Sequence, residues 1–328
     1  MPDVYTTLKA EYAAAHTGAV VYDSSPLGRL RLTGQSRIDF LHRMSTNDMN
    51  ALKPGQGAAT ILTTPIARIV DRVIVYVREN DALMLTSRGA QATVSGWLRK
   101  YIFFNDDVQV HAASSEYGMV SVYGSKAGDV VTRASGQDVS DLKLHHWRNG
   151  ADGVLIARAD PIAGNGFHLL APMLATVSQL WQAAMDCGAT PIGEQALEVL
   201  RIESGLPRYG RELSEMYLPQ EVGLWADVSF SKGCYIGQEI IARMESRGRL
   251  AKQLVGLRAV EPFEADLAVH LGEGSIGVVS SVAARPGGDW IGLGFVKPDR
   301  ATHGTRVNIG TQQRAADIVS LPISPRHL

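Results

Sequence analysis

Short alternating runs that end in turn residues are the feature that most limits what this chain can fold into. Apolar and polar residues alternate over brief stretches, and glycine, which accounts for 33 of the 328 residues, separates many of them. Such alternation predicts strands with one buried face. No strand–helix–strand rhythm runs along the chain, so we do not expect a doubly wound parallel sheet. The pattern predicts an α+β fold of mainly antiparallel sheets with a few helices.

The length of the chain and a change in its residue pattern near residue 250 predict the domain organisation. A single compact core rarely extends to 328 residues, so we expect more than one domain. After residue 250, short strand-like runs at 254–260, 275–282, 290–296 and 306–309 are separated by Gly, Pro and Asp. This texture predicts a small C-terminal β-barrel over 250–328, and two interleaved α+β subdomains over 1–249.

Periodicity in the first 249 residues predicts individual elements. Ser36 followed by Asp39 resembles a capping box that opens a short helix ending near 44. Further helices are predicted at 90–102, 173–187 and 193–204, where apolar residues follow the 3.6-residue period. Strands are predicted at 28–34, 69–77, 83–87, 109–112, 119–123, 154–159 and 167–170.

Composition excludes several classes of protein. An apolar content of 45%, a charged content of 20% and a net charge of −1 describe an ordinary globular chain without a dedicated nucleic-acid or anionic-membrane surface. No apolar stretch approaches membrane-spanning length, and the N-terminus lacks the order of a signal peptide, so we expect a cytoplasmic protein. Two cysteines, Cys187 and Cys234, do not make a disulfide framework.

Two carboxylates lie at positions that are energetically unfavourable for an ionised side chain. Asp71 shares one side of its strand with Ile69 and Val73, and a buried carboxylate needs a partner or a shifted pKa. The alternative to a functional role is an Asp satisfied by backbone donors or by Arg. Glu203 lies in the last turn of a predicted helix, where it opposes the helix dipole. Its alternative is an exposed ion pair with Arg201 or Arg208.

The segment from Lys232 to Glu239, Lys-Gly-Cys-Tyr-Ile-Gly-Gln-Glu, places one thiol between a cation and two glycines. Nearby positive charge favours the reactive thiolate form of Cys234, whereas the alternative is a small buried residue.

His145 and His146 are adjacent, so in a strand they point to opposite faces, and no third ligand stands at metal spacing. We therefore predict no metal site.

Taken together and in order, these motifs resemble a known superfamily. The segments that carry the resemblance are Gly28 to Gly34, Phe40-Leu-His, Thr46-Asn-Asp, Ile69-Val-Asp, Arg201-Ile-Glu-Ser-Gly and Tyr209-Gly. They are similar to the tetrahydrofolate-binding T-proteins, the aminomethyltransferases of the glycine cleavage system. The cysteine segment, with Ala242-Arg243 and Gly248, resembles the YgfZ-type branch. Those are folate-binding proteins that support assembly or repair of iron–sulfur enzymes.

The resemblance implies a ring-like arrangement of three domains around a central folate channel. The implied ligand is tetrahydrofolate or a one-carbon derivative. An acid at the position of Asp71 contacts the folate near N5 and N10, and one at the position of Glu203 binds the pterin edge. Tyr209, Lys232 and Arg243 complete the predicted folate contacts, and Asp71 and Cys234 are the predicted catalytic residues.

The chain also departs from both groups that it resembles. Glycine-cleavage enzymes usually have a second Asp where this chain has Arg72, and an acid where it has Cys234. Many YgfZ-type proteins have lost the acid that this chain keeps as Asp71. Three functions therefore stay open: folate-dependent support of iron–sulfur proteins, folate-dependent aminomethyl or methyl transfer, and a non-catalytic interaction scaffold. The expected partners are folate and iron–sulfur client or assembly proteins, with no membrane partner and a monomeric chain.

Overall fold

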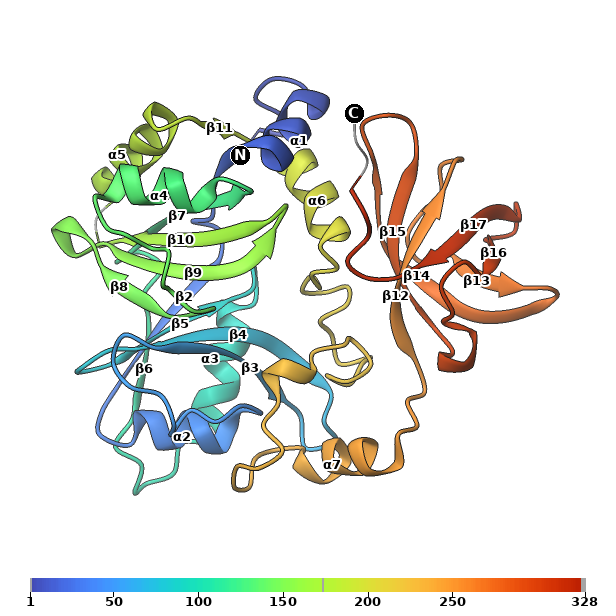
Figure 1. The fold of residues 1–328 in the computed structure, drawn as a ribbon. Helices are drawn as coiled ribbons and strands as arrows, with labels where there is room; N and C mark the ends of the chain where they lie inside the picture. The colour runs from blue at the N-terminus through green and yellow to red at the C-terminus, as the bar shows by residue number, and fades with distance from the viewer. Residues whose placement is uncertain (1, 173, 326–328) are drawn as a thin grey trace.

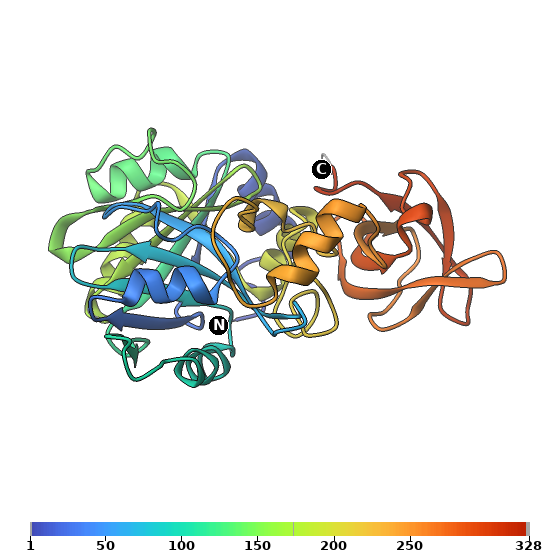
Figure 2. The same cartoon turned by 90° about the horizontal axis from the view of Figure 1, so that it is seen from below.

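Two stacked sheets and a separate barrel make up the fold. The computed structural model of the chain describes residues 2–172 and 174–325. Within these residues, a five-stranded sheet, a six-stranded sheet and a closed barrel surround helix α6, Glu194–Glu203 (Figure 1). Seen from below, the barrel stands on one side and the two sheets on the other, with helix α7, Gln238–Arg247, between them (Figure 2). The predicted α+β class, mainly antiparallel with a C-terminal barrel, is confirmed.

The first sheet has the strand order β3-β4-β5-β2-β6 and is antiparallel throughout. Its strands are β2 Gly28–Thr33, β3 Gly57–Thr63, β4 Ile69–Val77, β5 Ala82–Thr86 and β6 Gln109–Ala112. Helices α2, Arg37–Met44, and α3, Gln91–Lys100, cover one face. Phe40 and Leu98 from these helices pack against Val73 and Val75 of β4, which buries that side of the strand.

The second sheet has the order β11-β1-β7-β10-β9-β8, and only its β1–β11 pair is parallel among the described strands. The strands are β1 Ala19–Asp23, β7 Gly118–Gly124, β8 Trp147–Asn149, β9 Leu155–Ile162, β10 Asn165–Ala171 and β11 Ala189–Pro191. Helices α4, Ala127–Ser135, and α5, Leu174–Asp186, pack on one face. Helix α1, Leu8–Thr17, packs on both β1 and α6.

The two sheets meet face to face. Ile74 and Tyr76 of β4 pack against Leu155 and Leu170 of the second sheet, so β4 is buried on both sides. An ion-pair cluster crosses the same interface. Arg72 of β4 donates to both oxygens of Asp160 on β9, at 2.7 and 3.0 Å, and through Nε to Asp227 at 2.6 Å. Although burial opposes ionisation, Arg72 lowers the pKa of Asp160 to about 2.

The barrel closes through the strand order β12-β15-β14-β13-β16-β17. Its strands are β12 Gln253–Ala259, β13 Ala268–Leu271, β14 Gly274–Ala284, β15 Trp290–Val296, β16 Arg306–Ile309 and β17 Arg314–Val319. Apolar residues of α6, among them Leu200 and Ile202, share a core with Leu293 and Phe295 of the barrel. We propose a domain boundary near residue 250, because α7 ends at Arg247 and β12 begins at Gln253.

The sequence located most of the strands but missed several helices. The predicted elements at 69–77, 109–112, 290–296 and 306–309 match β4, β6, β15 and β16 residue for residue. Helices α1, α4 and α7 were not predicted. The helix predicted at 173–187 corresponds to α5, and its first position, 173, lies outside the described residues. The capping box at Ser36 was wrong, because its hydroxyl caps no helix and instead accepts from the Asp107 N–H at 3.3 Å.

Candidate functional site

A cavity of about 1040 Å³ lies where the two sheets, α6 and the barrel meet. Helix α6 contributes Glu194, Glu198 and Arg201 to its wall. The turn after β5 contributes Ser87 and Arg88, and the loop after α6 contributes Tyr209. Strand β14 of the barrel closes one side with the residues at 282–284. The central position of this cavity matches the channel that the sequence resemblance implies.

Asp71 lies one hydrogen bond behind this wall. Its side chain is fully buried, and its Oδ2 accepts from the N–H of cavity-lining Ser87 at 2.9 Å. The other oxygen, Oδ1, is buried and has no hydrogen-bond partner among the described residues. Burial raises the pKa of Asp71 from 3.8 to about 6. The chain thus holds, next to a large cavity, a carboxylate with one oxygen unsatisfied, and such a group readily accepts a hydrogen bond.

Glu203 lies at the end of α6, where both of its carboxylate oxygens contact polar side chains, and it does not line the cavity. Its Oε1 accepts from Tyr12 at 2.7 Å and pairs with Nε of Arg285 at 2.8 Å, while Oε2 contacts His16 Nε2 at 3.2 Å. Its ion pair is therefore buried and made with the barrel, not exposed and made with Arg201 or Arg208. The pterin contact implied for Glu203 stays a prediction, and in this structure the residue ties α1, α6 and the barrel together.

The cysteine segment lies away from the cavity. Cys234 is exposed, and no residue between 232 and 243, all of them described, lines the cavity. Lys232 is buried, and its ammonium donates to the backbone oxygens of His42, Ser45 and Asn47 near the end of α2. Burial lowers the pKa of Lys232 to about 8. These contacts engage all three ammonium protons of Lys232. Arg243 is exposed and also lies outside the cavity wall. Folate contacts of both residues therefore stay predictions.

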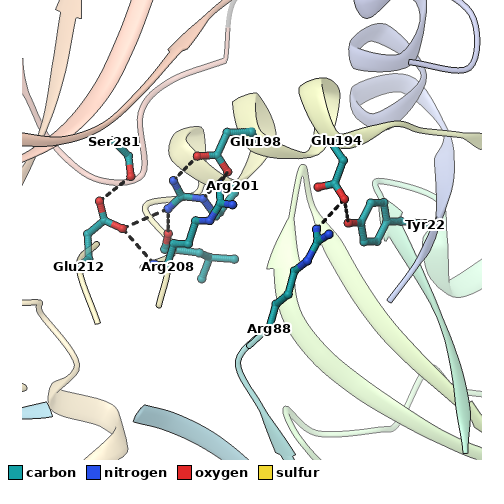
Figure 3. A network of polar contacts seen from close by, with 9 residues as sticks. Tyr22, Arg88, Glu194, Glu198, Arg201, Arg208, Glu212 and Ser281 are labelled. Atoms are coloured by element: carbon teal, nitrogen blue, oxygen red, sulfur yellow. Dashed lines mark hydrogen bonds and ion pairs between the residues drawn. The ribbon is translucent and has the colours of Figure 1, made fainter. Parts of the chain in front are cut away.

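A charged network that the sequence did not predict lines the cavity (Figure 3). Arg88 donates to Glu194 at 2.7 Å, and the Tyr22 hydroxyl donates to the same oxygen at 3.0 Å. Further along α6, Arg201 holds both oxygens of Glu198, at 2.9 and 2.7 Å. One signal was available in the sequence: the two acids are four residues apart in a predicted helix and therefore share a face.

Comparison with known families identifies the group to which the chain belongs. The sequence model described as the GCVT N-terminal domain matches residues 1–232. The chain belongs to the GCVT family. This match covers both sheets and α6, which together supply most of the cavity wall, and it ends at Lys232, within the cysteine segment.

Two curated relatives span most of this GCVT-family chain. A protein of Arabidopsis thaliana, named provisionally as a chloroplastic transferase, is 32% identical over 90% of this chain and 69% of its own length. The aminomethyltransferase of Listeria monocytogenes is 30% identical over 99% of this chain and 92% of its own. Neither name mentions iron–sulfur proteins. Because one relative is named chloroplastic, cytoplasmic placement of this chain stays a prediction.

A solved structure establishes the fold of this GCVT-family chain. The glycine cleavage system aminomethyltransferase T from Bartonella henselae superposes with a TM-score of 0.88, covering 98% of this chain and 91% of that chain at 23% identity. The chain therefore has the aminomethyltransferase fold. None of the helices in the described part of the chain has the length and apolar character needed to cross a bilayer.

Proposed function

We propose that this chain binds tetrahydrofolate, or a one-carbon derivative of it, in the central cavity and acts as a one-carbon transferase of the T-protein type. The observation that carries the proposal is Asp71, a buried carboxylate with one unsatisfied oxygen behind the cavity wall. The aminomethyltransferase names of its relatives support the same class of reaction. When bound, tetrahydrofolate supplies N5 and N10, the nitrogens that carry one-carbon units.

The chain's own residues supply a carboxylate and a large cavity beside it. With a pKa of about 6, Asp71 is mostly ionised at neutral pH and can still exchange a proton there. A preorganised carboxylate in a site of low dielectric stabilises positive charge on a neighbouring nitrogen. Tyr209 adds an aromatic face to the cavity wall, and Glu194 adds a second acceptor for ring N–H groups.

An assay with defined components tests the transferase. The protein is incubated with tetrahydrofolate and an aminomethylated lipoyl carrier protein, and methylene-tetrahydrofolate is measured. We expect product formation by the wild type and little by Asp71→Asn, since the variant keeps the shape of the side chain but loses its charge. Equal amounts of product from both proteins would count against the proposed role of Asp71.

A second function rests on the exposed thiol. We propose, following the YgfZ-type resemblance of its segment, that Cys234 supports assembly or repair of iron–sulfur proteins through direct contact with a partner protein. The observation that favours this is its place on the surface, outside the cavity. A partner reaches an exposed thiol without entering the folate site.

Cys234→Ser should separate the two functions. In a strain lacking the gene, the Ser variant is expected to fail to restore the activity of iron–sulfur enzymes. Its affinity for tetrahydrofolate should stay within about twofold of wild type, because surface substitutions away from a site usually change free energies by less than 0.5 kcal/mol. Cys187→Ser, which changes the half-buried second cysteine, is the matched control. Full restoration by the Cys234 variant would exclude the thiol role.

A further inference from the structure

The positively charged side chains of the cavity are engaged to different degrees. Among the described residues that line it, the cations are Arg88, Arg201 and Arg208. A folate carries a glutamyl group with two carboxylates that are ionised at neutral pH. A cavity that binds such a ligand needs a cation whose hydrogen-bond donors are still available.

Two of the three arginines each form a close ion pair with a carboxylate of α6. Arg201 holds Glu198 with a two-pronged contact and donates its remaining nitrogen to the Leu206 carbonyl at 2.5 Å. Its side chain is only 11% exposed. Arg88 donates to Glu194 at 2.7 Å, within the ordinary range for a charged hydrogen bond.

Arg208 is about as exposed as Arg88, whose side chain is 56% exposed, but it differs from both arginines in making no ion pair of hydrogen-bond length. Its side chain is 54% exposed, and its guanidinium has one ionic contact, at 3.4 Å to Glu198. That distance exceeds the usual range for an N–H···O hydrogen bond, and both oxygens of Glu198 already accept from Arg201. Arg208 is therefore the cavity-lining cation, among the described residues, whose donors are most available to a ligand.

The backbone of Arg208 is nevertheless held firmly. Its N–H donates at 2.9 Å to Glu212, a carboxylate with no exposed surface. Ser280 and Ser281 of barrel strand β14 donate to the other oxygen of Glu212 at 2.5 and 2.7 Å. The Arg208 carbonyl accepts from the Leu213 N–H at 3.0 Å. These buried hydrogen bonds thus fix the backbone of Arg208, and its half-exposed guanidinium lies at the cavity wall (Figure 3).

We propose that Arg208 is the carboxylate anchor of the central cavity and binds the glutamyl group of tetrahydrofolate. This inference rests on the proposed function, because it names the part of the ligand that one residue recognises. The planar guanidinium matches a carboxylate through two parallel hydrogen bonds. Tyr209, the next residue, lines the same cavity with an aromatic ring, suited to the aryl group that precedes the glutamate.

Two ligands that differ only in the glutamyl group test the assignment. Calorimetric titration of the wild type is expected to show about tenfold tighter binding of tetrahydrofolate than of tetrahydropteroate, which lacks the glutamate. Arg208→Gln should lose this preference while binding tetrahydropteroate as the wild type does, and Arg208→Lys should keep part of it. Arg211→Gln is the matched control, since Arg211 follows in the same loop, pairs with Asp266 and lies outside the cavity wall.

The possible outcomes distinguish the role of Arg208 from tetrahydrofolate binding itself. If the folded Arg208→Gln variant keeps the wild-type preference, or if the wild type binds both ligands equally, Arg208 is not the anchor although the folate site stands. If the wild type binds neither ligand, the proposed function fails and the inference fails with it. A loss of preference in Arg211→Gln equal to that in Arg208→Gln would also overturn it, because a general loss of positive charge would then explain the effect.

Discussion

Asp71→Asn is expected to weaken tetrahydrofolate binding at least tenfold without destabilising the fold at pH 7.5. Loss of a charged hydrogen bond to a ligand typically costs about 1.5–3 kcal/mol. In the wild type, the ionised carboxylate of Asp71 destabilises the folded state. The rise of its pKa from 3.8 to about 6 corresponds to a cost of about 3 kcal/mol on ionisation. The amide removes that penalty, while its own unpaired N–H group offsets part of the gain.

The pH dependence of stability gives this prediction a clear sign. Because the pKa of Asp71 is raised in the folded state, its favourable contribution is fully present below about pH 4 and is lost as pH rises through about 6. The difference in free energy of unfolding, variant minus wild type, should therefore fall when urea denaturation is repeated at pH 5. Asp299→Asn, at an exposed position, is the control. A difference that stays flat or grows would contradict the assigned pKa.

Arg72→Met is expected to lower the free energy of unfolding by about 3–5 kcal/mol. The substitution leaves Asp160 and Asp227 without the guanidinium that both contact. Removing one partner of a buried ion pair is costly because the remaining charge keeps its desolvation penalty. Urea unfolding at neutral pH measures the loss.

Two further variants show whether the charge is the cause. Adding Asp160→Asn to Arg72→Met should recover part of the lost stability, since it removes one of the stranded charges. Arg31→Met breaks the exposed pair with Glu116 and should cost less than about 1 kcal/mol. A loss from Arg72→Met as small as that from Arg31→Met would mean that the cluster contributes little to holding the sheets together.

Local patterns in the sequence foretold the burial of Asp71 but not its partners. Its neighbours Ile69 and Val73 alternate with it along β4, and alternation alone placed it on a buried side. Its hydrogen-bond donor is the N–H of Ser87, which lies in the turn after β5 and is brought to Asp71 by the pairing of β4 with β5. The expectation that Asp71 lies on a buried side of its strand is thus confirmed, while its role in a site stays a prediction.

Partners distant in sequence account for what could not be foreseen. Arg285, which pairs with Glu203, belongs to the barrel, and the carbonyls that accept from Lys232 lie at the end of α2 and just after it, 185 to 190 residues earlier. No periodicity reports such pairs. Helix α7 was missed because most of its side chains are polar, and its apolar contact through Ile241 is apparent only once the central core is assembled. The exposure of Cys234 likewise depends on how its segment packs on the first sheet.

Titration of the wild-type protein with tetrahydrofolate tests the central claim most directly. Isothermal calorimetry at pH 7.5 should show saturable binding of one ligand per chain, and the same titration with Asp71→Asn should show markedly weaker binding. The absence of saturable binding to a folded wild-type protein would contradict the account. The remaining function would then be that of an interaction scaffold on the aminomethyltransferase fold.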